Sequence, residues 1–211
     1  MPGLLYRHPI LYDATLRVIH GTALLRRMEI LADEIGEGVR VFDVGCGTCT
    51  LQRHLKAGCR YMGLDLNERF VRHAQGRGIA ARVGDVFDEG NYPGDLDVIV
   101  LSDILHHIIP RHDELVALCK RKAGKVIVCE PHSQHPPSRA ATSGLVHRGW
   151  RRLCSIEKFN RVFGDFDGHN RFDEMKLWDE YVKEKLTDLL TGYGMRTRQV
   201  DDYVIGVWQR R

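Results

Sequence analysis

Hydrophobic residues near the N-terminus recur at steps of three and four residues, which is the spacing of one face of an α-helix. The pattern runs from Ile10 to Glu34 and is interrupted at Gly21, a residue that tolerates non-helical backbone angles. It predicts two short helices or one broken helix. We interpret residues 5–36 as an N-terminal helical cap.

Short hydrophobic runs that end in glycine or an acidic residue follow this cap, as is typical of buried parallel strands. Strands are predicted at residues 39–45, 60–66, 81–85, 96–102 and 125–130. Helices are predicted between them at residues 48–56, 68–75 and 113–122. This alternation predicts a doubly wound α/β fold whose mostly parallel sheet has helices on both faces.

The alternation stops after Pro131. Residues 132–172 contain consecutive prolines and a basic stretch with interleaved aromatic residues, and we interpret them as an inserted, lid-like segment. An amphipathic pattern predicts a helix over residues 173–191, and runs at 195–200 and 203–209 predict a C-terminal antiparallel hairpin. Residues 1–211 are therefore predicted to form a single domain around a seven-stranded sheet.

Composition and charge are those of an ordinary globular protein. Hydrophobic residues make up 43% of the chain, and 31 basic and 28 acidic residues leave a net charge of +3, too balanced for a protein that mainly coats a polyanion. The six cysteines are scattered through hydrophobic segments, which indicates reduced thiols. Neither a signal peptide nor a run of about 18 apolar residues occurs, so a cytoplasmic protein is expected.

Acidic residues and glycines stand at the ends of the predicted strands. Asp43 and Gly45 end the first strand and Gly47 follows, while Asp65 ends the second strand and Asp85 the third. Ligands of such sheets bind beyond the carboxyl ends of the strands. One carboxylate can accept hydrogen bonds from both hydroxyls of a ribose, and another from the exocyclic amine of an adenine. The pattern therefore predicts an adenosine site.

The segment VFDVGCGTCT resembles the first motif of the class I S-adenosylmethionine-dependent methyltransferases, in which an acidic residue is followed by glycines at every second position. The resemblance covers residues 39–131, and the C-terminal helix and hairpin fit it as well. Cys49 departs from it, standing where the family usually has a third glycine. A nicotinamide or flavin enzyme is the less favoured alternative, because its fingerprint requires a small residue where Thr50 stands.

The resemblance implies a Rossmann-like methyltransferase fold, S-adenosylmethionine as the methyl donor and S-adenosylhomocysteine as the product. Within it, Asp65 would hold the ribose, Asp85 would read adenine together with the Val86 backbone, and Ser102 and Asp103 would lie near the sulfonium. A helix cap or turn role is the alternative for the first two. The residues assigned to the cofactor all lie at or just after strand ends: Asp43, Gly45, Gly47, Asp65, Leu66, Asp85, Val86 and Ser102.

A histidine pair follows the fourth predicted strand in SDILHHI, a segment that resembles small-molecule methyltransferases related to the quinone-biosynthesis enzymes. His106 or His107 could remove a proton from the acceptor as the methyl group arrives. The alternative is a partly buried histidine that joins loop and helix. Methyl transfer depends mainly on in-line placement in a dry pocket, so a dedicated base is not required.

The acceptor is expected between the N-terminal helices and the segment after the fifth strand. The candidate contacts are Tyr12, Arg17, His132 and Trp150, with a surface role as the alternative for the first two. The basic segment 139–163 has three open interpretations: a lid over a hydrophobic acceptor, a helix in peripheral contact with a membrane, or a patch that binds RNA.

Absent motifs narrow the targets further. SDIL stands where amino-methylating DNA and glutamine enzymes carry Asn-Pro-Pro-Tyr or Asp-Pro-Pro-Tyr, and there is no Pro-Cys nucleophile for cytosine, so DNA is not an expected partner. No metal is predicted, because Cys46 and Cys49 lack a second pair and Asp103 and Glu130 lack evident oxygen neighbours.

We predict methyl transfer to oxygen, nitrogen or carbon of a small molecule, including hydrophobic or lipid-like metabolites. The alternatives are an RNA or protein methyltransferase and a non-catalytic adaptor; the oligomeric state is left open.

Overall fold

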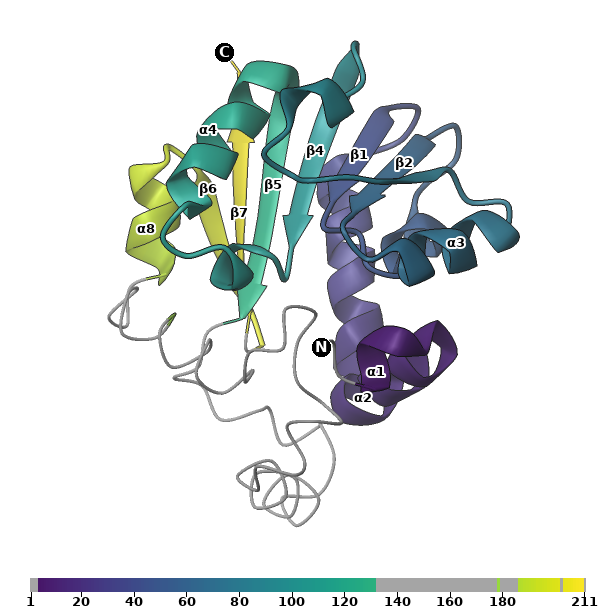
Figure 1. The fold of residues 1–211 in the computed structure, drawn as a ribbon. Helices are drawn as coiled ribbons and strands as arrows, with labels where there is room; N and C mark the ends of the chain where they lie inside the picture. Colours follow the sequence, from purple (N-terminus) through teal and green to yellow (C-terminus); the bar gives the residue numbers. More distant parts are fainter. Residues whose placement is uncertain (1–3, 132–177, 179–185, 202, 211) are drawn as a thin grey trace.

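Figure 1 shows a computed structural model of the chain, which describes residues 4–131, 178, 186–201 and 203–210. The elements in chain order are α1 (Leu4–Arg7), α2 (Pro9–Ile35), β1 (Arg40–Val44), η1 (Thr50–His54), β2 (Arg60–Asp65), α3 (Glu68–Gly76), β3 (Ala81–Val83), η2 (Glu89–Asn91), β4 (Leu96–Ser102), η3 (Leu105–His107), α4 (His112–Lys122), β5 (Ala123–Pro131), α8 (Leu186–Gly192), β6 (Arg196–Val200) and β7 (Tyr203–Gln209). Those labelled η are short 3-10 helices.

The strands of the described residues form one seven-stranded sheet in the order β3-β2-β1-β4-β5-β7-β6. Strands β1 to β5 are parallel to their neighbours in this group, whereas β7 runs antiparallel to both β5 and β6. The order along the sheet reverses at β1, which pairs with β2 on one side and β4 on the other. This is the predicted sheet with its C-terminal hairpin, and its switch point lies beyond the ends of β1 and β4.

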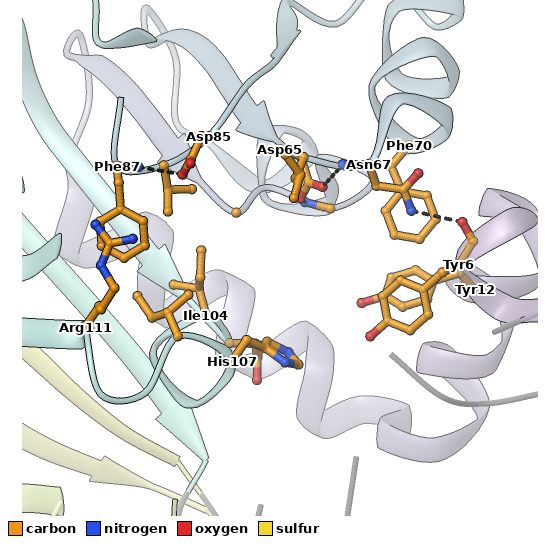
Figure 2. Close-up of a pocket in the computed structure, with 16 residues that line it drawn as sticks. Tyr6, Tyr12, Asp65, Asn67, Phe70, Asp85, Phe87, Ile104, His107 and Arg111 are labelled. Carbon is orange, nitrogen blue, oxygen red and sulfur yellow. Dashed lines mark hydrogen bonds between the residues drawn. The ribbon is translucent and has the colours of Figure 1, made fainter. Parts of the chain in front are cut away.

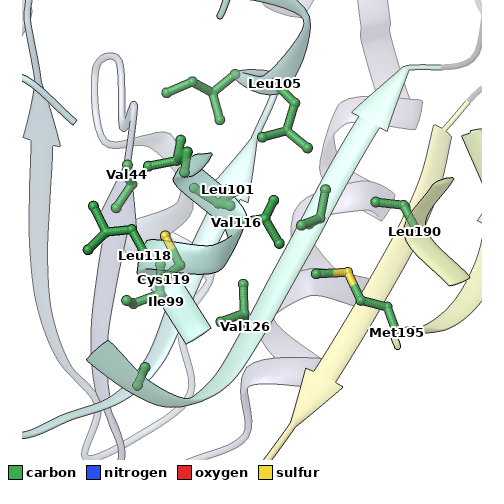
Figure 3. Packing of buried hydrophobic residues seen from close by; sticks show 14 of the residues in the cluster. Val44, Ile99, Leu101, Leu105, Val116, Leu118, Cys119, Val126, Leu190 and Met195 are labelled. Carbon is green, nitrogen blue, oxygen red and sulfur yellow. The ribbon is translucent and has the colours of Figure 1, made fainter. Parts of the chain in front are cut away.

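Helices cover both faces of the sheet, as the continuous hydrophobic strands predicted. Val98 and Val100 of β4 belong to the core cluster that contains α2, whereas Ile99 and Leu101 belong to the cluster that contains Val116 of α4 (Figure 3). Successive side chains of a strand point to opposite faces, so β4 contributes to both clusters. The hydrophobic side of α2 therefore packs on one face of the sheet, and α4 packs on the other.

The predicted break in the N-terminal helix is confirmed at Gly21, where φ is 51° and ψ is −131° inside α2. The predicted helix over residues 48–56 is wrong in kind and length, because only the 3-10 helix η1 forms there. Cys49 adopts a left-handed φ of 59° immediately before it, so the chain is still turning where a helix was expected to begin. The third strand is also shorter than predicted, so Asp85 lies just beyond β3, although the Gly84 N–H still donates to the Asp65 carbonyl at 3.1 Å.

The predicted lid-like segment 132–172 lies outside the described residues, and so does most of the predicted helix over residues 173–191, whose C-terminal part is α8. Within the part of the chain that the structure describes, no helix is long and apolar enough to span a membrane. The division of the chain into one domain with a cap and a lid remains a prediction.

Candidate functional site

A cavity of about 390 Å³ lies at the switch point, beyond the carboxyl ends of β1, β2 and β4 (Figure 2). A smaller hollow of about 100 Å³ lies against α2 and shares Tyr12, Gly45, Gly47 and Asp103 with it. Six of the predicted cofactor residues line the larger cavity: Gly45, Gly47, Asp65, Leu66, Asp85 and Val86. Asp43 and Ser102 line the smaller hollow. The structure thus brings all the predicted cofactor residues to one region, where their roles remain predictions.

The two glycines after β1 differ in the space around their Cα atoms. Gly45 has a φ of +72°, and a Cβ built on it would lie 2.3 Å from the Ile104 Cδ1 atom. Gly47 has a φ of +54°, but a Cβ built on it would meet no atom within 4 Å. Gly45 is therefore held by packing against the loop after β4, whereas Gly47 exposes backbone on the side of the cavity.

Asp65 joins the glycine turn to the start of α3. Its Oδ2 atom accepts a hydrogen bond from the Gly47 N–H at 2.7 Å, and its Oδ1 atom accepts one from the Asn67 N–H at 2.8 Å. Burial raises its pKa, and these two hydrogen bonds oppose that effect. Each carboxylate oxygen has a second lone pair. Asp65 is therefore a turn residue, as the alternative interpretation held, and also a carboxylate in the cavity wall with remaining capacity to accept hydrogen bonds.

Asp85 lies in the wall of the same cavity, where its Oδ1 atom accepts a hydrogen bond from the Phe87 N–H at 2.9 Å. The neighbouring Val86 carbonyl is bound by the Tyr92 hydroxyl at 2.6 Å. Arg111 comes from the start of α4, and its guanidinium lies 3.6 Å from the centre of the Phe87 ring. This end of the cavity therefore combines a carboxylate with a flat aromatic and guanidinium surface.

Asp43 lies beneath the glycine turn and is 4% exposed. Its Oδ2 atom accepts a hydrogen bond from the Tyr61 hydroxyl at 2.7 Å. Burial raises its pKa to about 7; the Tyr61 hydroxyl lowers it and the charge of Asp65 raises it further. With this pKa the Asp43 carboxyl titrates near neutral pH, because burial disfavours its charged form.

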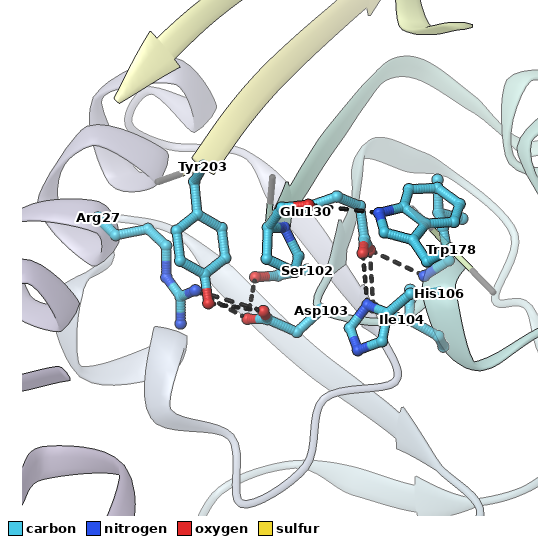
Figure 4. Close-up of polar contacts among 10 residues, drawn as sticks. Arg27, Ser102, Asp103, Ile104, His106, Glu130, Trp178 and Tyr203 are labelled. Carbon is cyan, nitrogen blue, oxygen red and sulfur yellow. Dashed lines mark hydrogen bonds and ion pairs between the residues drawn. The ribbon is translucent and has the colours of Figure 1, made fainter. Parts of the chain in front are cut away.

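Sequence reasoning missed a buried cation beside the predicted sulfonium region. Arg27 of α2 forms an ion pair with Asp103 at 3.0 Å, and its guanidinium lies 4.0 Å from the centre of the Tyr203 ring (Figure 4). The Tyr203 hydroxyl donates to Asp103 at 3.0 Å. Burial lowers the pKa of Arg27, but Asp103, Tyr203 and Cys129 together raise it by more, so the guanidinium stays protonated. No local pattern marks Arg27, because its partners lie far along the chain.

The structure separates the two candidate histidines. His106 is 3% exposed, and its Nδ1 atom lies 2.7 Å from a carboxylate oxygen of Glu130. His107 is exposed and lines the cavity. Of the pair, His107 is therefore the one placed to meet an acceptor, whereas His106 matches the alternative of a buried histidine in the loop.

The N-terminal helices contribute an aromatic side of the cavity. The Tyr12 ring lies 4.8 Å from that of Phe70 and 5.5 Å from that of Tyr6, centre to centre, and all three residues line the cavity. Tyr6 and Phe70 were not predicted as site residues. Arg17 is exposed and lines neither hollow. His132 and Trp150 lie outside the described residues.

The two residue pairs considered as metal ligands are Cys46 with Cys49 and Asp103 with Glu130. The sulfur atoms of Cys46 and Cys49 lie 3.4 Å apart, but in the described ranges no group of three or more potential ligands comes together. Glu130 directs its carboxylate at the backbone of Ile104 and Leu105 and at His106, whereas Asp103 pairs with Arg27 and Tyr203.

Comparison with known proteins agrees with this arrangement. Residues 42–126 match a family model described as a methyltransferase domain. The chain is 34% identical over 133 residues to trans-aconitate 2-methyltransferase of Mycolicibacterium gilvum, a match that covers 60% of this chain and 48% of that protein. The chain therefore spans about half the length of this curated relative.

Solved structures show the same fold at low sequence identity. The DhpI–SAH complex has a TM-score of 0.60 and 19% identity, covering 97% of this chain and 96% of that one. A SAM-dependent methyltransferase from Archaeoglobus fulgidus has a TM-score of 0.55 and 15% identity, covering 94% and 99%. Residues 42–126 therefore match a methyltransferase domain, and the chain shares the fold of a solved SAM-dependent methyltransferase.

Proposed function

We propose that the protein binds S-adenosylmethionine across the two joined hollows and transfers its methyl group to a small-molecule acceptor. The observation that carries this is the meeting of Gly47, Asp65 and Asp85 around one cavity at the switch point of the sheet. In this fold that crevice is where ligands bind. The bound cofactor supplies an electrophilic methyl group, and the protein's task is to hold and orient the two reactants.

The larger cavity fits the adenosine part. Asp65 accepts hydrogen bonds from the ribose hydroxyls with its remaining lone pairs, and Asp85 accepts from the adenine amine. The open space over Gly47 lets a ligand approach the backbone closely, since no atom lies within 4 Å of a Cβ built there. Phe87 and Arg111 provide a flat surface of the kind that stacks on a base.

The smaller hollow fits the amino-acid tail of the cofactor. Arg27 supplies a cation for the carboxylate, and Asp103 and Asp43 supply oxygen acceptors for the ammonium group. A zwitterion needs both signs of charge close together, and the Arg27–Asp103 pair presents both. Asp103 also lines the larger cavity, so its negative charge lies where a positive sulfonium is held.

If the group that receives the methyl loses a proton, His107 is the residue proposed to take that proton. It lines the cavity wall at the same end of the sheet as Asp65 and Asp103. Tyr6, Tyr12 and Phe70 give the neighbouring wall an aromatic surface, and a dry pocket favours methyl transfer over side reactions.

The relative's substrate, trans-aconitate, is a polyanion. Among the described residues the cavity wall carries three carboxylates, Asp65, Asp85 and Asp103, against the single guanidinium of Arg111. That charge balance does not favour a tricarboxylate, so the acceptor is proposed only as a small molecule. RNA or protein methylation through the basic segment 139–163 is the alternative; RNA retention that weakens steeply with salt, together with methyl transfer to RNA, would favour it.

Calorimetric titration with S-adenosylhomocysteine tests cofactor binding. We expect the wild-type protein to bind, and Asp65→Asn to bind at least tenfold more weakly, because hydrogen bonds to a charged acceptor contribute about 1.5–3 kcal/mol each and about 1.4 kcal/mol corresponds to tenfold. Asp95→Asn is the matched control, since Asp95 is 89% exposed in its side chain and lies before β4, at the other end of the sheet. No heat from the wild-type protein would favour the non-catalytic adaptor. Labelled methyl donor and a panel of small molecules then test transfer.

A further inference from the structure

Glu130 is a fully buried carboxylate at the end of β5 that the proposed reaction does not use directly. Its Oε1 atom accepts hydrogen bonds from the Ile104 and Leu105 N–H groups, both at 2.8 Å, and its Oε2 atom lies 2.7 Å from the His106 Nδ1 atom (Figure 4). One side chain thus binds three consecutive residues of the loop that follows β4.

This loop begins with an abrupt change of direction. The Asp103 N–H still bonds to the Cys129 carbonyl at 2.9 Å, continuing the ladder between β4 and β5, but Asp103 itself has a left-handed φ of 56°. The amides of Ile104 and Leu105 therefore lie beyond the end of the strand ladder. Buried N–H groups without acceptors are costly, and the Glu130 carboxylate supplies the acceptor.

The same loop forms one wall of the cavity. The Ile104 side chain occupies the space over Gly45, so it also limits how the glycine turn can move. His107 lines the cavity. Burial raises the pKa of Asp65, and a positive charge on the His107 ring would act in the opposite direction. Any shift of the loop would therefore change both the glycine turn and the surroundings of Asp65.

We infer that Glu130 is a positioning residue for the proposed methyl-transfer site: it fixes the turn after β4 so that Ile104 packs on Gly45 and His107 faces the cavity. His106 belongs to this buried anchor and is not the proton acceptor. The inference rests on the proposed function, because it assigns Glu130 a part in shaping the cofactor cavity.

Two substitutions separate the length of the side chain from its charge. Glu130→Gln keeps the length and an oxygen acceptor for the two amides, so we expect S-adenosylhomocysteine affinity within threefold of wild type. Glu130→Asp keeps the charge but withdraws the carboxylate by one methylene group, so it no longer reaches both amides. For it we expect at least tenfold weaker binding and faster hydrogen exchange at the amides of residues 104 and 105.

Ile127→Ala is the control for a loss of stability alone. Ile127 is also fully buried on β5, but it belongs to the core cluster on the α2 face rather than to the loop after β4. We expect this variant to unfold at lower urea concentration and to keep its affinity within twofold. An equal loss of affinity in the control, or unchanged affinity in Glu130→Asp, would overturn the positioning role.

A further variant keeps the test decisive if Glu130→Asp does not fold. Ile104→Ala leaves the carboxylate in place and removes the side chain over Gly45; at least fivefold weaker binding is expected, and wild-type affinity would refute the inference. Failure of the wild-type protein itself to bind would instead refute the proposed function, so the two failures are distinguishable.

Discussion

The two glycines of the turn after β1 allow a direct test of the packing seen in the structure. Gly45→Ala places a methyl group 2.3 Å from the Ile104 Cδ1 atom and 3.1 Å from its Cγ1 atom, at a φ of +72°. Gly47→Ala, at a φ of +54°, places its methyl group in open space. The two substitutions share the backbone strain and differ in the steric conflict.

The expected magnitudes follow from these contacts. A left-handed backbone costs an alanine about 1–2 kcal/mol, and this applies to both variants. Overpacking a core contact costs about 1–3 kcal/mol more, and this applies to Gly45→Ala alone. We therefore expect the free energy of unfolding to fall by about 2–5 kcal/mol for Gly45→Ala and by about 1–2 kcal/mol for Gly47→Ala.

Urea denaturation without ligand measures both values, and a double-mutant cycle tests their origin. Ile104→Val removes the Cδ1 atom that makes the closest contact, at a cost of about 0.5–1.5 kcal/mol by itself. The double variant Gly45→Ala with Ile104→Val should lose less unfolding free energy than the two single losses add up to, by about 1 kcal/mol or more. Equal losses for the two glycines, combined with additivity in the cycle, would show that Ile104 does not pack on Gly45.

Three further outcomes are expected from the polar contacts. Arg27→Met removes one partner of a largely buried ion pair with Asp103. Calorimetry should then show weaker binding of S-adenosylhomocysteine but unchanged binding of 5′-methylthioadenosine, which lacks the amino-acid tail. Equal losses for the two ligands would contradict the proposed role of Arg27 in binding the tail. The pKa of Asp43 is raised from 3.8 to about 7, so the folded state binds the extra proton, and its contribution to stability is lost as pH rises from about 4 to 7. Urea unfolding across this range should show a smaller decline in Asp43→Asn, and identical profiles would refute the shift. Asn67 caps α3 by accepting from the Arg69 N–H, and its amide donates to the Tyr6 carbonyl at 2.9 Å. Asn67→Ala should lower the unfolding free energy by about 1 kcal/mol, and Asn67→Ser, which keeps an oxygen acceptor for the cap, by less; the reverse order would contradict the capping role.

Several features of the fold were predictable because their causes are local. The bounds predicted for β4 and β7 are those observed, and the helix break at Gly21 was predicted from one glycine in a periodic pattern. Continuous hydrophobic runs indicate strands covered on both faces, and the acidic residues at their ends come together because parallel strands share one carboxyl edge. The error at residues 48–56 arose because the extent of the glycine turn depends on Cys49, whose left-handed backbone no hydrophobic pattern reveals.

The amino-acid sequence by itself determined the order of strands and helices and the collection of Asp43, Asp65 and Asp85 at one edge, since both follow from side-chain periodicity and chain direction. Only the tertiary structure decided which of two adjacent, chemically identical histidines enters the cavity, because that choice depends on the turn after β4 and on the distant carboxylate of Glu130. The contact of Arg27 with a residue 76 positions away was likewise decided by packing of α2 on the sheet. Whether a side chain is buried, and where it points, depends on residues that become its neighbours only when the chain folds.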